Sequence, residues 1–119
     1  MIGVEPVGAD AMTRSLAEGS PVRLDRLDTI ADGLAAPFAG AHTLRHVQAF
    51  VDEMVVVEDQ AIAHAVRLIM QRCKLAPEPS GAAGIAALLS GAVELPAGAR
   101  VLAVISGGNA DHEMLKRLL

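Results

Sequence analysis

The residues best suited to chemistry stand near the end of the chain, where an apolar run stops at Ser106-Gly107-Gly108-Asn109. Ligands of open α/β sheets bind beyond the carboxyl ends of the strands. The two glycines allow a ligand to approach the backbone closely, and the Ser106 hydroxyl can donate to a ring nitrogen or a phosphate. The alternative is an ordinary strand-to-helix turn, in which Asn109 caps the last helix.

The elements that must position this turn follow an alternating order. Runs that are apolar on both faces predict strands of a parallel sheet, and apolar residues three or four apart predict helices. A long irregular connection, residues 22–37, joins two of these elements, and such connections often carry function. The order predicts an α/β fold, a partial open parallel sheet with flanking helices. The predicted strands are 2–6, 54–57 and 101–105, and the predicted helices are 9–16, 43–51, 59–74, 81–89 and 111–119.

Composition excludes several classes of protein. The net charge of −4 has the wrong sign for a nucleic-acid or anionic-membrane surface. No apolar run approaches the roughly 18 residues of a membrane span, and the first residues lack the basic start of a secretory signal. Cys73 is the single cysteine, so no disulfide framework exists and a reducing cytoplasm is the expected compartment.

Four motifs occur together in the chain: Gly3-Val4-Glu5-Pro6, the run from Thr29 to Ala35, the run from Glu78 to Ala82, and the run from Val104 to Asn109. In this order and spacing they resemble the threonine/serine dehydratase and serine racemase family of fold type II pyridoxal 5′-phosphate (PLP) enzymes. The resemblance covers essentially all 119 residues. It matches only the C-terminal third or so of a family catalytic domain, so residues 1–119 are expected to form one partial domain.

The resemblance implies roles for particular residues around the cofactor. Ser106 matches the family serine that hydrogen-bonds the pyridine nitrogen, and the turn Gly107-Gly108-Asn109 forms the floor of that site. Gly33 matches a glycine whose backbone passes the face of the ring. Glu78 matches a glutamate near the ring; the alternative for Glu78 is a carboxylate that only stabilises the start of a helix.

The resemblance also implies a divalent-metal site that some family members have. Glu5, the carbonyl of Ala9 and the residue at position 11 align with its ligands. Position 11 is Ala11, where a second carboxylate is expected. Hard cations want several oxygen ligands, so the missing carboxylate weakens the prediction of metal binding, and Glu5 would otherwise be a surface charge.

The family's Schiff-base lysine and glycine-rich phosphate loop lie in a segment that precedes the matched region. Lys74 and Lys116 are the only lysines, and neither has the flanking sequence of that lysine. Without the amine, the chain alone is expected not to be an active dehydratase.

The leading interpretation is therefore the C-terminal fragment of a PLP-dependent dehydratase that converts a small hydroxy amino acid to a 2-oxo acid and ammonia. Its partners would be that substrate and the missing N-terminal segment or a partner chain, and a homo-oligomer is possible in the complete enzyme. Two alternatives stay open: a fragment of a serine racemase, and a non-catalytic binding or interaction module of the same fold.

Overall fold

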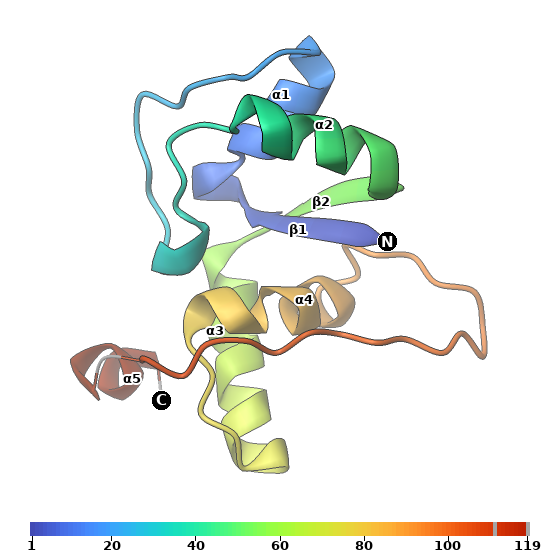
Figure 1. Ribbon diagram of the computed structural model, residues 1–119. Helices are drawn as coiled ribbons and strands as arrows, with labels where there is room; N and C mark the ends of the chain where they lie inside the picture. Colours follow the sequence, from blue (N-terminus) through green and yellow to red (C-terminus); the bar gives the residue numbers. More distant parts are fainter. Residues whose placement is uncertain (111, 119) are drawn as a thin grey trace.

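The computed structural model describes residues 1–110 and 112–118 (Figure 1). These residues form two strands and five α-helices, with short 3₁₀ or π turns between some of them; two helices follow the first strand and three follow the second. The strands are β1 (Ile2–Pro6) and β2 (Glu53–Val57). The helices are α1 (Ala11–Glu18), α2 (Ala41–Phe50), α3 (Asp59–Leu68), α4 (Pro79–Leu89) and α5 (His112–Leu118), and the turns are η1 (Val7–Ala9), η2 (Asp32–Leu34) and η3 (Ile69–Cys73).

The sheet of the described residues consists of β1 and β2, which pair in parallel. Ile2 lies opposite Glu53 and Pro6 opposite Val57, so both strands end at the same edge. Parallel strands need a crossover, and α1, the long loop after it and α2 supply one. The parallel arrangement and the helical flanks confirm the predicted fold class.

The helices cover the sheet from two sides: α1 and α2 lie on one side, α3 and α4 on the other (Figure 1). Helix α4 contacts both strands and packs along α3. Its buried face consists of glycine and alanine, which allows the backbones of α4, α3 and the sheet to come close. The core of buried side chains runs through Val55, Val57, Ile62, Ala65, Val66, Ile69, Ala82, Ala86 and Ala87.

The predicted helix 59–74 is confirmed in extent, although its winding changes. After Leu68 the backbone continues as the π-helical turn η3 and ends at Lys74, which is left-handed with φ of 59°. This wider last turn leads the chain into Ala76 and the buried Pro77, directly before α4.

The predicted strand 101–105 is wrong for this chain. The segment carries no strand assignment and pairs with neither β1 nor β2. It runs instead across α4 (Figure 1), with the carbonyl oxygen of Val104 facing Gly84. A β-strand needs a neighbouring strand edge for its hydrogen bonds, and neither strand of the described sheet offers its edge to this segment. Leu102 and Val104 are consequently 87% and 69% exposed.

The molecule is flat, with extents of 40 × 37 × 19 Å and a radius of gyration of 14.4 Å. A compact domain of this length has a radius of gyration of about 13.5 Å. Within residues 1–110 and 112–118, no helix is long and apolar enough to cross a membrane.

The position of the core predicts that two substitutions in α3 differ in their effect on the free energy of unfolding. Ile62 is fully buried, whereas His64 on the same helix is exposed. Ile62→Ala should lower the free energy of unfolding by about 2–5 kcal/mol, because it removes buried methylene groups and leaves a cavity. His64→Ala should change it by less than about 0.5 kcal/mol. Urea denaturation followed by circular dichroism measures both, and equal effects would contradict the assigned core.

Candidate functional site

The start of α4 is built around Glu78. Pro77 and Pro79 are both buried and fix the backbone on either side, while the Glu78 side chain is half-buried. Glu78 is the N-cap residue, with an extended backbone, and Pro79 is the first helical residue. Proline suits that position because its missing N–H is not needed there. The helix therefore begins two residues before the predicted start at Gly81, and Glu78 rather than Ser80 is its N-cap.

The Glu78 carboxylate lies against the backbone of Gly107. A Cβ atom built on Gly107 would lie 2.2 Å from Glu78 Cδ and 2.4 Å from Glu78 Oε1. Gly107 is also left-handed, with φ of 70°. Any other residue would meet both the strained backbone and the carboxylate, so this contact requires glycine.

Gly33 approaches the same carboxylate from the other side. Its backbone N–H donates to Ser80 Oγ at 2.8 Å, and a Cβ atom on Gly33 would lie 3.3 Å from Glu78 Oε1. Gly33 belongs to the 3₁₀ turn η2, which lies within the long connection between α1 and α2. Three predicted site residues that are far apart in sequence, namely Gly33, Glu78 and Gly107, thus meet at the start of α4.

The remaining predicted residues lie beside this meeting point. The backbone of Ser106 passes over α4 at Gly81, where a Cβ atom would lie 1.6 Å from the Ser106 carbonyl oxygen. Gly108 follows near the carbonyl of Ala76, and Gly108 and Asn109 are exposed. Within residues 1–110 and 112–118, neither the Ser106 hydroxyl nor the Glu78 carboxylate has a hydrogen-bond partner. Both groups are free to bind a ligand.

Ser80 and Gly81 were not predicted as contributors to the site. Ser80 holds Gly33 through its hydroxyl, and Gly81 lets the Ser106 backbone approach. The signal was present in the motif Glu78-Pro79-Ser80-Gly81, because a small hydroxyl residue and a glycine inside a first helical turn favour side-chain-to-backbone bonding and close packing.

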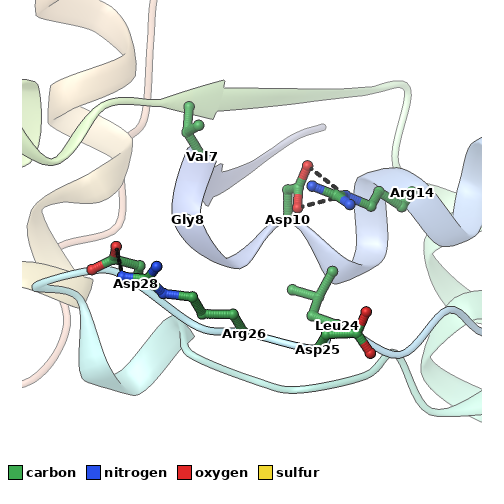
Figure 2. A pocket seen from close by; sticks show the side chains of 8 residues that line it. All are labelled: Val7, Gly8, Asp10, Arg14, Leu24, Asp25, Arg26 and Asp28. Atoms are coloured by element: carbon green, nitrogen blue, oxygen red, sulfur yellow. Dashed lines mark hydrogen bonds and ion pairs between the residues drawn. The ribbon is translucent and has the colours of Figure 1, made fainter.

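A pocket of about 320 Å³ lies elsewhere, between the turn after β1 and residues 24–28 (Figure 2). Four of its five charged side chains pair with one another, Arg14 with Asp10 and Arg26 with Asp28. Ion pairs of this kind contribute little binding energy, and the fifth charged residue, Asp25, is an exposed carboxylate with no second unpaired charge beside it in the pocket. The pocket therefore carries no chemistry comparable to that at the start of α4.

Glu5, the expected metal ligand, has a different set of contacts. Its Oε1 accepts from the N–H of Met12 at 2.9 Å, and its Oε2 accepts from the N–H of Thr13 at 2.8 Å and from Thr13 Oγ1 at 2.7 Å. These are the unpaired amides at the start of α1, so Glu5 caps that helix from the end of β1.

These contacts do not fit a divalent cation. Both Glu5 oxygens face N–H and O–H donors at the positive end of a helix, where a cation is repelled. The neighbouring Ala11 is buried and brings no carboxylate. Residues 1–110 and 112–118 contain no cluster of three or more His, Cys, Asp or Glu side chains able to hold a metal. The geometry favours a helix cap over the expected pair of ligands, Glu5 and the Ala9 carbonyl.

The parallel strands and their flanking helices place the chain in the α/β class. Within that class, the family described as pyridoxal-phosphate dependent enzyme matches residues 1–107. The chain belongs to this family of PLP-dependent enzymes.

Three relatives illustrate the match. Phenylserine dehydratase of Ralstonia pickettii is 40% identical over 119 residues, which are 100% of this chain and 36% of that protein. The processed form of threonine deaminase isoform 2 from Solanum lycopersicum superposes with a TM-score of 0.88 at 35% identity, covering 98% of this chain and 34% of that one. Maize serine racemase superposes with a TM-score of 0.86 at 38% identity, and the match covers 98% of this chain and 36% of that protein. The chain spans about a third of the length of these proteins.

The contact between Gly107 and Glu78 can be tested against a matched glycine. Gly91 is equally left-handed, with φ of 74°, but no atom lies within 4 Å of a Cβ placed there. Both Gly→Ala variants should cost about 1–2 kcal/mol for backbone strain. Gly107→Ala should cost about 0.5–1.5 kcal/mol more, because the Glu78 side chain must leave its present rotamer. Equal losses in chemical denaturation would show that Glu78 does not occupy this position.

If Glu5 caps α1, it stabilises the folded chain whether or not a metal ion is present. Glu5→Gln should lower the free energy of unfolding by about 1 kcal/mol, because it weakens charge-assisted hydrogen bonds to α1. Glu18→Gln, at the exposed far end of α1, is the control and should not destabilise. Thermal denaturation with and without Mg²⁺ or Ca²⁺ measures both effects. A cation-dependent rise in the melting temperature that Glu5→Gln abolishes would contradict the cap.

Proposed function

We propose that this chain is the C-terminal portion of the catalytic domain of a PLP-dependent dehydratase acting on a small hydroxy amino acid. The observation that carries the proposal is the convergence of Gly33, Glu78 and Gly107 at the start of α4, beside an unpaired Ser106 hydroxyl. These are the residues in which the chain resembles the family's cofactor site.

The flat shape and the exposed apolar residues support the proposal that residues 1–119 are one partial domain. The run 101–105 exposes Val101, Leu102, Val104 and Ile105, although each is a residue typical of a buried strand. About two-thirds of each relative's length has no counterpart in this chain. In the proposal, that N-terminal portion covers the exposed run and brings the lysine and the phosphate-binding loop.

Bound PLP supplies an electron sink for the electrons left on the substrate α-carbon. The role proposed for Ser106 is to hold the pyridine nitrogen by a hydrogen bond to its hydroxyl. A neutral hydroxyl does not keep that nitrogen protonated as a carboxylate would, so the sink is weaker.

The other residues shape the space around the ring. Gly107 and Gly108, followed by Asn109, form a floor without side chains, and Gly33 lets its backbone pass the ring face. Glu78, fixed between two prolines, presents an unpaired carboxylate to a ring substituent or to a bound substrate. The proposal includes no metal, because Glu5 is already bonded to α1. The single cysteine is compatible with the reducing cytoplasm expected for such an enzyme.

A serine racemase is the second candidate, favoured by the superposition on the maize enzyme. Both candidates use the same cofactor site, so the residues of this chain do not separate them. The products separate the two candidates: a dehydratase releases a 2-oxo acid and ammonia, whereas a racemase returns the other enantiomer of the substrate.

The test is a chimera that joins the N-terminal portion of the Ralstonia pickettii phenylserine dehydratase to this chain. We expect the chimera to bind PLP and to release ammonia from a hydroxy amino acid, and the 119-residue chain alone to release none. Ser106→Ala should weaken PLP binding about tenfold, through the loss of one hydrogen bond. Ser90→Ala, an exposed serine at the end of α4, is the matched control and should bind normally.

Three outcomes would decide against the proposal. Ammonia release by the chain alone would show that no N-terminal portion is needed. A folded chimera that binds no PLP would favour a non-catalytic module. Formation of D-serine from L-serine without a 2-oxo acid would assign the racemase function.

A further inference from the structure

We infer that Asp59 is a positioning residue for the cofactor site, acting through the loop that carries Gly33; this inference rests on the proposed function. Asp59 is the first residue of α3, directly beyond the carboxyl end of β2. It was predicted only as the start of a helix. Its side chain points instead to the long connection between α1 and α2.

Both carboxylate oxygens of Asp59 bond to that connection. Thr29 Oγ1 donates to Asp59 Oδ1 at 2.6 Å, and the backbone N–H of Ile30 donates to Asp59 Oδ2 at 2.8 Å. Thr29 Oγ1 also accepts from the N–H of Ala31 at 3.1 Å. The two side chains together satisfy consecutive backbone amides of an otherwise irregular segment, which fixes its path.

Ala31 leads this fixed segment into the site. It is fully buried, and the 3₁₀ turn η2 begins at the next residue. Gly33, two residues further on, donates to Ser80 Oγ and lies close to Glu78. Figure 1 shows η2 beside the junction of β2 and α3. A continuous series of contacts thus connects Asp59 to the point where Gly33 meets α4.

Because Gly33 is closely packed against α4, its position depends on the contacts that lead to it from Asp59. A Cβ atom on Gly33 would lie only 2.8 Å from Ser80 Oγ, so the glycine already approaches α4 as closely as its backbone allows. A shift of the loop away from α4 would break the bond to Ser80, and a shift along it would change the surface that Gly33 presents to the cofactor. Asp59 therefore acts on the site without touching the ligand.

The first measurement is amide hydrogen exchange of Ile30, Ala31 and Gly33 in the 119-residue chain, read by NMR. Asp59→Asn replaces one acceptor oxygen by an amide, and Thr29→Val removes the hydroxyl at nearly constant volume. Each variant should speed exchange at these three amides about tenfold. Thr29→Ser keeps the hydroxyl and should restore the slow exchange. Glu58→Gln removes a neighbouring exposed charge at the start of the same helix and should leave these rates unchanged.

The second measurement is PLP affinity and the absorption maximum of the bound cofactor in the chimera with the Ralstonia pickettii enzyme. Asp59→Asn and Thr29→Val should each weaken binding about tenfold and shift the maximum, and the double variant should lose little more than either alone. Thr29→Ser and Glu58→Gln should match the unsubstituted chimera. All are compared at a temperature where every variant is folded.

The outcomes separate this inference from the function on which it rests. If the unsubstituted chimera binds no PLP, the proposed function fails, and the role of Asp59 fails with it. If that chimera binds PLP and Asp59→Asn leaves affinity and absorption unchanged, the role of Asp59 alone is overturned. Unchanged exchange at Gly33 in both Asp59→Asn and Thr29→Val would also overturn it.

Discussion

The rest of the candidate site depends on how closely the backbone at Ser106 and Gly107 approaches the first turn of α4. Gly81 has no side chain to keep Ser106 away, and Gly107 has none to push Glu78 aside. The same turn receives Gly33 through Ser80. One helix start therefore sets the relative positions of two loops that are more than 70 residues apart in sequence. It does so through contacts at glycines, where an added methyl group would displace the facing backbone or side chain.

Three carboxylates stand at helix starts, and they differ in what they bond. Glu5 bonds to the amides of α1, and Asp59 bonds to the segment at Thr29 and Ile30. Glu78 precedes α4 without a hydrogen-bond partner among the described residues. The helix dipole favours a negative charge at all three places. Two of the charges are used to organise the fold, and the third remains available to a ligand.

Sequence reasoning predicted the parallel strands β1 and β2 and most helices from local patterns. The family motifs named Gly33, Glu78 and Gly107, which the structure brings together at the start of α4, and their role toward a cofactor stays a prediction. Sequence reasoning missed Asp59 and Ser80, whose partners lie 29–30 and 47 residues away and leave no periodic signal. It also predicted a strand at 101–105, since an apolar run indicates a buried strand wherever a neighbour exists. The strand that would pair with this run depends on the order of strands in the whole sheet, so it cannot be deduced from the sequence of the run itself. The prediction of a metal at Glu5 was already weakened by Ala11, and the structure shows both Glu5 oxygens bonded to a helix that begins six residues later.

The unpaired run Val101–Ile105 also bears on how such a chain behaves in solution. Five consecutive apolar residues without charge or proline are the kind of segment from which intermolecular β-aggregation starts. Arg100 precedes the run, and Ser106 with two glycines follows it, so a charge and poor strand formers limit it to five residues. Aggregation-prone segments usually extend over six or seven. The residues that shape the floor of the proposed site thus act as gatekeepers as well, because they limit the neighbouring aggregation-prone segment to five residues.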